Sequence, residues 1–178
     1  MAWSSMLLRT NTDWGSSLMS IQAGERMPSG VFGVMTEAGP GAASTDELFA
    51  GRKVVLVSVP GAFTPTCSAS HLPGFLQNAD AIRAKGVDTI AFMAVNDVHV
   101  MDAWGNDQGV GDQIVMLADG NGEYAEALDL VMDGTPFGMG KRGKRFAIVI
   151  EDGKATHVAV EAPGQFEVSK AESILSVI

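Results

Sequence analysis

The chain has 178 residues, of which 46% are hydrophobic and 21 are glycine, enough for one globular domain with a full core. A formal net charge of -9 argues against nucleic acid or an anionic membrane as a partner, because phosphate binding needs a dense basic surface. The only cysteine, Cys67, excludes a disulfide within the chain and fits a reducing compartment such as the cytoplasm.

Residues 1–19 are expected to form a disordered extension ahead of one folded domain, residues 20–178. The extension holds a single basic residue, Arg9, and one short apolar run, Met6-Leu7-Leu8, which is too little for a secretory signal. Its many Ser and Thr residues leave a weak organelle-targeting sequence as the alternative. No apolar stretch of the sequence approaches the ~20 residues of a membrane-spanning helix.

Strand-like and helix-like segments alternate along the rest of the chain. Near-continuous apolar runs predict buried strands at 53–59, 88–95 and 113–117, and apolar residues at helical spacing predict helices at 72–82, 98–105 and 123–130. Strands at 145–150 and 155–160 flank an Asp-Gly turn and form a hairpin, after which Ser169 is expected to cap a helix running to Ile178. This order predicts a thioredoxin-like α/β fold, with a central mixed sheet flanked by helices.

Cys67 lies between the first of these strands and the helix that follows it. At such junctions backbone N–H groups point outward, and their partial positive charge favours a thiolate over a thiol. Pro60, Gly61 and Pro65 stiffen the connection, and Thr64 can offer a hydroxyl to whatever the sulfur binds. These neighbours favour a reactive cysteine over a small buried hydrophobe.

Pro73 conflicts with a helix that begins at Thr66 or Cys67, because it would stand inside the second turn and remove a hydrogen bond there. A kink is therefore predicted near residues 70–73. If the helix instead began at Pro73, the thiolate would lose most of the help of the helix dipole and depend more on a charged side chain.

The run from Pro60 to Cys67, PGAFTPTC, resembles the active-site signature of the peroxiredoxins. The next eight residues, SASHLPGF, narrow the resemblance to the type II, or peroxiredoxin-five-like, group, and residues 95–97, 104–105, 117–119 and 144–146 also fall where that group has similar residues. The resemblance covers residues 20–178. It implies a thiol-dependent peroxidase that reduces hydrogen peroxide and small organic hydroperoxides and uses no metal or other cofactor.

The resemblance also implies a role for each matching residue. Cys67 would attack a peroxide oxygen and become a sulfenic acid. Thr64 would hydrogen-bond the thiolate and the peroxide, Pro60 would keep water from the sulfur, and Thr66 would support the site. Arg145 would supply the positive charge that stabilises the thiolate and the leaving oxygen.

Four basic residues fall within positions 141–145, and their sequence context separates them. Lys141, Arg142 and Lys144 are interpreted as a solvated basic loop, whereas Arg145 begins a strand and offers a planar, permanently charged donor.

His71 follows Cys67 by four residues, so on a helix it would lie on the same face as Cys67, as a polar neighbour or a proton carrier. A direct catalytic role for His71 is the less favoured reading. Neither of the other two histidines has the spacing of a metal ligand.

The single cysteine determines how the sulfenic acid is reduced. Relatives in the resembled group that resolve it internally carry a second cysteine, and here Phe92 and Ser169 stand in the two regions concerned. An external thiol must therefore act, and glutathione with glutaredoxin is expected ahead of thioredoxin.

Two further expectations concern partners and the rival function. The resemblance implies a homodimer, to which Trp104 or Phe63 would contribute apolar area unless both belong to the core. The rival to a peroxidase is a non-enzymatic thioredoxin-fold protein that uses Cys67 as a redox sensor or as a partner-binding thiol.

Overall fold

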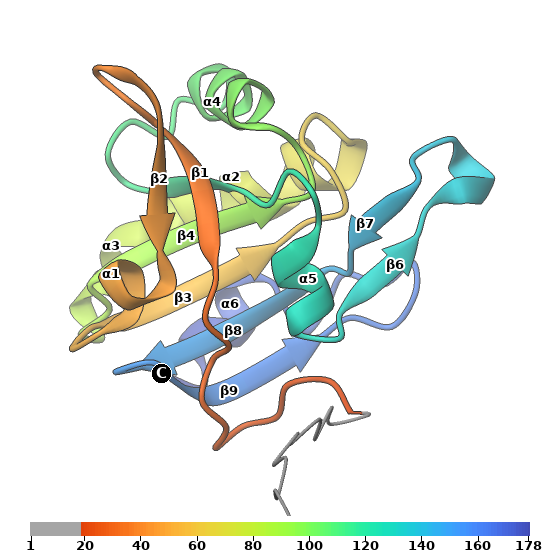
Figure 1. The fold of residues 1–178 in the computed structure, drawn as a ribbon. Coiled ribbons are helices and arrows are strands. Elements are labelled where there is room, and N and C mark those ends of the chain that lie inside the picture. The colour runs from red at the N-terminus through yellow and green to blue at the C-terminus, as the bar shows by residue number, and fades with distance from the viewer. Residues whose placement is uncertain (1–18) are drawn as a thin grey trace, which may run out of the picture.

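The computed structural model describes residues 19–178 (Figure 1). The predicted extension, except for its last residue, lies outside the described residues. Seven strands form one mixed sheet in the order β2-β1-β5-β4-β3-β8-β9, in which β3, β4 and β5 are parallel and the other pairings are antiparallel. The strands are β1 (Val31–Thr36), β2 (Gly39–Ser44), β3 (Lys53–Ser58), β4 (Thr89–Ala94), β5 (Val115–Ala118), β8 (Phe146–Glu151) and β9 (Lys154–Val160). A separate two-stranded hairpin, β6 (Val131–Asp133) and β7 (Lys141–Gly143), projects beside the sheet, with the short 3-10 helix η2 (Thr135–Phe137) at its tip.

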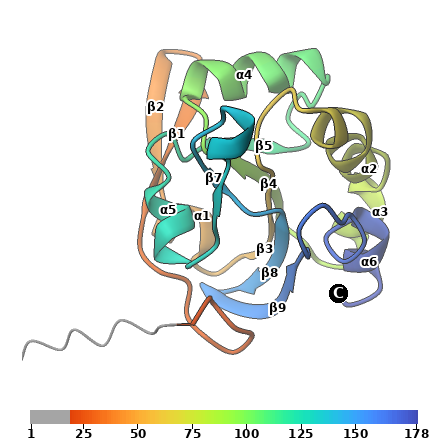
Figure 2. The ribbon, with the colours of Figure 1, turned by 90° about the vertical axis from the view of Figure 1, so that its right-hand side faces the viewer.

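Helices cover both faces of the sheet (Figure 2). One face carries α1 (Thr45–Phe49) and α5 (Glu123–Ala127), and the other carries α2 (Leu72–Gln77), α3 (Ala79–Ala84), α4 (Val98–Asp107) and α6 (Ala171–Leu175). Alternate residues of the central strand β3 enter the two cores, Val55 and Val57 on the side of α2 and Val54 and Leu56 on the side of α5. The predicted α/β fold with a mixed sheet between helices is confirmed.

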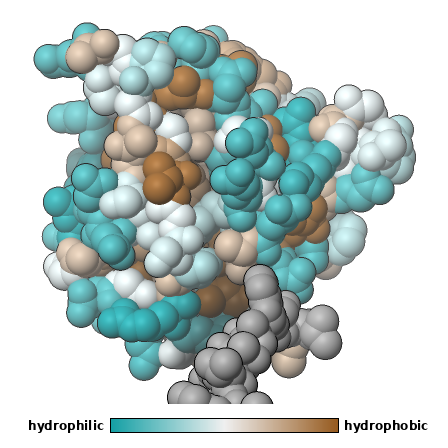
Figure 3. Space-filling model, in the orientation of Figure 1, coloured by the Kyte–Doolittle hydropathy of each residue, from teal (hydrophilic) through white to brown (hydrophobic). Residues whose placement is uncertain are grey.

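The surface on the side of α1 and α5 is mostly hydrophilic, with hydrophobic residues exposed in separate small patches (Figure 3). Within residues 19–178, no helix combines the length and the apolar character that crossing a bilayer requires.

The predicted C-terminal hairpin is confirmed. Asp152 and Gly153 both have positive φ, 48° and 73°, as the turn between two tightly joined antiparallel strands requires. The predicted cap of the last helix is wrong, because α6 begins after Lys170 and the buried hydroxyl of Ser169 donates instead to Glu161. A buried carboxylate attracts that hydroxyl more strongly than the exposed end of a five-residue helix does.

Candidate active site

The loop between β3 and Cys67 is held in one shape by contacts with its neighbours. The backbone N–H of Ala62 donates to Asn96 Oδ1 at 2.9 Å, which ties the loop to the end of β4. A Cβ at Gly61 would lie 3.2 Å from both Arg142 Nη1 and Thr64 Cγ2, closer than ordinary van der Waals contact, so a larger residue there would displace these side chains. Phe63 has a φ of 62°, a strained conformation for a bulky residue that persists only where the surroundings impose it.

Cys67 begins a helical segment that continues to the end of α2. Its first turn, η1 (Cys67–His71), is a π-helix in which the N–H of Leu72 donates to the carbonyl oxygen of Cys67. Pro73 follows within the first two residues of α2. The irregularity predicted before Pro73 is therefore a π-helical turn, a feature common at functional sites. Trp104 Nε1 of α4 donates to Ser68 Oγ at 2.9 Å and anchors this turn to the core.

Two side chains converge on the sulfur of Cys67, which is fully buried. Thr64 Oγ1 lies 2.8 Å from Sγ, and Arg145 Nη2 lies 3.3 Å from it. Arg145 is 78 residues away along the chain, but it directly precedes β8, whose first residue pairs with Ser58 at the end of β3. The pairing of β3 with β8 thus brings the guanidinium to the place where the loop presents the cysteine.

His71 is completely buried and contacts the same guanidinium. Its Nδ1 lies 2.8 Å from Arg145 Nη1, and its Nε2 lies 3.0 Å from the carbonyl oxygen of Ser169. Burial and the positive charge of Arg145 lower the pKa of His71 to about 4, although Ser169 and Glu161 act in the opposite direction. His71 thus lies beside the site with both ring nitrogens engaged, one by Arg145 and one by Ser169.

The chain resembles known proteins both in sequence and in fold. A model of the redoxin family matches residues 22–175. Peroxiredoxin-2B of Arabidopsis thaliana is 43% identical over 159 residues, which cover 89% of this chain and 98% of that protein. Chloroplastic Peroxiredoxin-2E of the same plant is 40% identical over 164 residues, covering 89% of this chain and 70% of that protein. The crystal structure of reduced Prx3 from Vibrio vulnificus in complex with hydrogen peroxide superimposes with a TM-score of 0.84 at 49% identity, covering 88% of this chain and 98% of that one.

The chain belongs to the peroxiredoxins. It is a thiol-dependent peroxidase, and its single cysteine, together with its peroxiredoxin-2 relatives, fits a one-cysteine member of the type II group. The family resemblance read from residues 60–75 is thereby confirmed.

A cleft of about 420 Å³ opens next to the site of this peroxiredoxin. Arg145, which contacts the sulfur, lines this cleft together with Pro60 and Thr66. The exposed side chain of Thr66 does not cap the helical segment. The rest of the wall is largely apolar and includes Met132, Phe137, Val160, Pro163 and Phe166. The cleft thus offers apolar surface beside the guanidinium.

Two residues lie elsewhere than the sequence indicated. Arg142 is half-buried and donates to the carbonyl oxygens of Met139 and Val95, so its interpretation as part of a solvated loop is wrong. Trp104 is fully buried and cannot contribute to a subunit contact, which corrects that expectation, whereas Phe63 is 52% exposed. Lys141 forms an exposed ion pair with Glu126, as expected of a surface lysine.

The aromatic rings and the Ser169 carbonyl that surround His71 were not predicted from the sequence. The rings of Phe75, Phe92 and Phe166 surround the imidazole at centroid distances of 4.9 to 5.7 Å, and Arg145 Cζ lies 5.7 Å from the centre of the Phe166 ring. The four-residue spacing of Cys67 and His71 was the one available signal. Nothing in the local sequence connects His71 with Ser169, 98 residues later.

Proposed function

We propose that Cys67 is the peroxidatic cysteine and that Thr64, Arg145 and Pro60 complete its site. The observation that carries this proposal is the convergence of Thr64 Oγ1 and Arg145 Nη2 on one buried sulfur. Both donors can stabilise a thiolate, and both remain beside it when a peroxide oxygen arrives. Pro60 stands half-buried at the entrance, where it limits the access of water.

The reaction transfers one oxygen atom to the sulfur. The Cys67 thiolate attacks the nearer oxygen of the peroxide, an S–O bond forms and the O–O bond breaks. The leaving oxygen takes the electron pair of that bond, is stabilised by Arg145 and takes up one proton, so water or an alcohol departs. Cys67 is left as a sulfenic acid.

Stopped-flow oxidation by hydrogen peroxide tests this assignment, with Cys67→Ser as the control. We expect the wild-type protein to react orders of magnitude faster than free cysteine at matched pH. A rate equal to that of free cysteine would contradict the assignment. It would favour the rival hypothesis, in which Cys67 is a redox-sensing or partner-binding thiol. The positions of Thr64 and Arg145 argue against that rival, because a sensor needs only a reactive thiol, whereas a peroxidase also needs donors aimed at the peroxide.

The cleft beside Arg145 supports organic hydroperoxides as substrates in addition to hydrogen peroxide. The organic group is attached to the leaving oxygen, so it extends past Arg145 toward the apolar wall formed by Met132, Phe137 and Phe166. Met132→Gln should slow reduction of cumene hydroperoxide about ten-fold and leave hydrogen peroxide reduction near its wild-type rate. The matched control is Met35→Gln, a half-buried methionine on β1. Equal slowing of both peroxides by Met132→Gln would count against this use of the cleft.

We infer that glutathione, with glutaredoxin, reduces the sulfenic acid. The chain has one cysteine, so an external thiol must form a mixed disulfide with Cys67, and a small thiol reaches a buried sulfur more readily than a protein thiol does. Turnover with glutathione and glutaredoxin, compared with turnover with thioredoxin, tests this order of preference. Turnover with thioredoxin, and none with glutathione and glutaredoxin, would reverse this order of preference.

A homodimer is the proposed assembly, with Phe63 in its interface. Phe63, in the active-site loop, has a strained backbone and is 52% exposed, and such an imposed exposure of an aromatic side chain favours contact with a partner. Sedimentation at micromolar concentration should show a dimer that Phe63→Glu dissociates and Phe137→Glu, at a 75% exposed aromatic on η2, does not. A wild-type monomer under these conditions would contradict the proposal.

We propose the cytoplasm as the location of the protein, with organelle targeting by residues 1–19 as the alternative. The composition of that segment supports the first, and the chloroplastic designation of Peroxiredoxin-2E supports the second. Fluorescent fusions with and without these residues test the choice, since only a targeting segment would redirect the fusion.

A further inference from the structure

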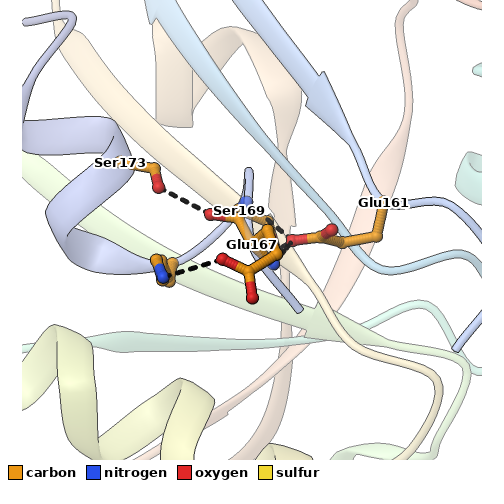
Figure 4. A network of polar contacts seen from close by, with 5 residues as sticks. Glu161, Glu167, Ser169 and Ser173 are labelled. Carbon is orange, nitrogen blue, oxygen red and sulfur yellow. Dashed lines mark hydrogen bonds and ion pairs between the residues drawn. The ribbon is translucent and has the colours of Figure 1, made fainter. Parts of the chain in front are cut away.

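Glu161 is a buried carboxylate near the active site that the proposed reaction does not use. It follows β9 directly and is 8% exposed. Its Oε1 accepts three hydrogen bonds of 2.8 Å, from the backbone N–H groups of Glu167 and Ser169 and from the hydroxyl of Ser169 (Figure 4). Burial alone would raise the pKa of Glu161, but the hydrogen bonds from Ser169 and Glu167 outweigh it and lower the pKa. Glu161 is therefore ionised, and the three hydrogen bonds to its Oε1 hold the 167–169 turn.

The turn held by Glu161 determines which nitrogen of His71 carries the hydrogen. The carbonyl oxygen of Ser169 lies 3.0 Å from His71 Nε2, and a carbonyl can only accept. Nε2 must therefore be the protonated nitrogen of the neutral ring. Nδ1 is then the acceptor, as the guanidinium N–H of Arg145 at 2.8 Å requires.

His71 holds Arg145 in place without neutralising it. No ion pair of residues 19–178 involves Arg145, and its side chain contacts Cys67 Sγ, His71 Nδ1 and the ring of Phe166. A carboxylate in direct contact would fix the guanidinium equally well but would compete with the thiolate for its charge. A neutral imidazole positions the guanidinium and leaves its charge for the sulfur and the peroxide.

A backbone hydrogen bond also links Glu161 directly to Arg145. The backbone N–H of Glu161 donates to the carbonyl oxygen of Arg145 at 3.0 Å, so the residue that holds the turn is also tied to the strand that carries the arginine. The charged or titratable groups around His71 are Cys67 on its own helical segment, Arg145 before β8 and Glu161 after β9.

We propose that Glu161 and Ser169 are positioning residues for the peroxidase reaction, which fix His71 as the Nε2–H tautomer and through it hold Arg145 against Cys67. The proposal rests on the proposed role of Arg145. It assigns Glu161 a function through the position of its oxygen and not through its charge at the sulfur.

Two conservative variants separate position from charge. Glu161→Gln keeps an acceptor oxygen at the end of a side chain of the same length and loses the charge. Glu161→Asp keeps the charge but draws the oxygen back by one methylene, away from its three donors. We expect Glu161→Asp to lower the rate of Cys67 oxidation by hydrogen peroxide about ten- to hundred-fold, and Glu161→Gln to lower it at most a few-fold. The matched control is Glu167→Gln in the same turn, where the exposed side chain of Glu167 pairs with Lys170.

The tautomer of His71 provides a readout that does not depend on activity. Nitrogen NMR of histidine-labelled protein distinguishes a protonated Nε2 from a protonated Nδ1, and the signals of His71 are identified by their loss in His71→Gln. We expect Nε2–H in the wild type, in Glu161→Gln and in Glu167→Gln, and a mixture of tautomers in folded Glu161→Asp. The opposite order, with Glu161→Gln impaired and Glu161→Asp normal in rate and tautomer, would overturn the proposal, as would normal behaviour of both variants.

Arg145→Ala makes failure of the two proposals distinguishable. A normal rate in Arg145→Ala would remove Arg145 from the reaction whatever the tautomer of His71. A slow Arg145→Ala combined with a normal Glu161→Asp would leave Arg145 in place and overturn only the positioning by Glu161.

Discussion

Thr64 Oγ1 lies 2.8 Å from Cys67 Sγ, and the hydroxyl of Thr64 has a single hydrogen to donate. The same oxygen lies 2.8 Å from the carbonyl oxygen of Gly61. When the sulfur carries a proton, the S–H group donates to Oγ1 and the hydroxyl donates to Gly61. When the sulfur is a thiolate, the hydroxyl hydrogen turns to the sulfur. Thr64 therefore serves both states through rotation of one O–H bond.

Thr64→Val tests this arrangement, because valine has the shape of threonine and lacks the hydroxyl. We expect its oxidation by hydrogen peroxide to be about a hundred- to a thousand-fold slower, as on loss of one fixed donor to a reacting centre. Thr64→Ser keeps the hydroxyl and should retain most of the rate. Stopped-flow measurements at several pH values check both, and a Thr64→Val protein with the wild-type rate would exclude a part for the hydroxyl in the reaction.

Arg145→Ala should remove two contributions of the guanidinium, the attraction of its charge for the thiolate and its stabilisation of the leaving oxygen, and should lower the rate by ten- to a thousand-fold. Arg145→Lys should recover only part of the loss. Lysine keeps the charge, but its single ammonium group cannot reach the sulfur at 3.3 Å and His71 Nδ1 at 2.8 Å with the planar two-pronged geometry of arginine. Rate against pH, with thiolate formation followed by its ultraviolet absorbance, separates the two effects. Full activity of the lysine variant would show that charge alone is sufficient.

Acid should destabilise the fold through His71. Its pKa lies near 4 in the folded protein and near 6.5 as an ordinary histidine, so between these values the unfolded chain binds more protons and stability falls as the pH falls. This one group should lower the free energy of unfolding by about 2 kcal/mol between about pH 7 and about pH 5. Urea unfolding at the two pH values measures the change. Between these pH values the free energy of unfolding should fall by about 2 kcal/mol less in His71→Gln than in the wild type. An equal fall in both proteins would refute the assignment to His71.

Oxidation by one equivalent of peroxide should add one oxygen atom to the protein, or one glutathione when that thiol is present. No disulfide within the chain can form, because the sequence holds one cysteine. Excess peroxide should carry Cys67 on to the sulfinic acid, with loss of activity. Mass spectrometry of the intact protein follows each product, and a modified mass in Cys67→Ser would place the chemistry elsewhere.

Elements with a strong local pattern could be predicted from the sequence. The apolar runs of β3 and β4 and the Asp152-Gly153 turn are visible in the residues themselves, because buried parallel strands and tight hairpins restrict which residues they accept. The β1–β2 hairpin carries no such pattern, since β2 reads GPGAAS and is a sheet edge with much of its surface exposed. Its place in the sheet depends on pairing with β1 and not on its own residues.

The reactive groups of this peroxiredoxin can be read from residue type and short spacing: one cysteine, a threonine three residues before it, a histidine four residues after it, and no second thiol to resolve the product. The chain carries these features without folding. The surroundings of the sulfur, in contrast, depend on how distant segments pack together. Arg145 reaches Cys67 because β8 pairs with β3, and Ser169 reaches His71 because Glu161 draws the 167–169 turn over the ring. These contacts join residues that are 78 and 98 positions apart in the sequence. They depend on strand order and on buried hydrogen bonds, and no short stretch of sequence specifies either.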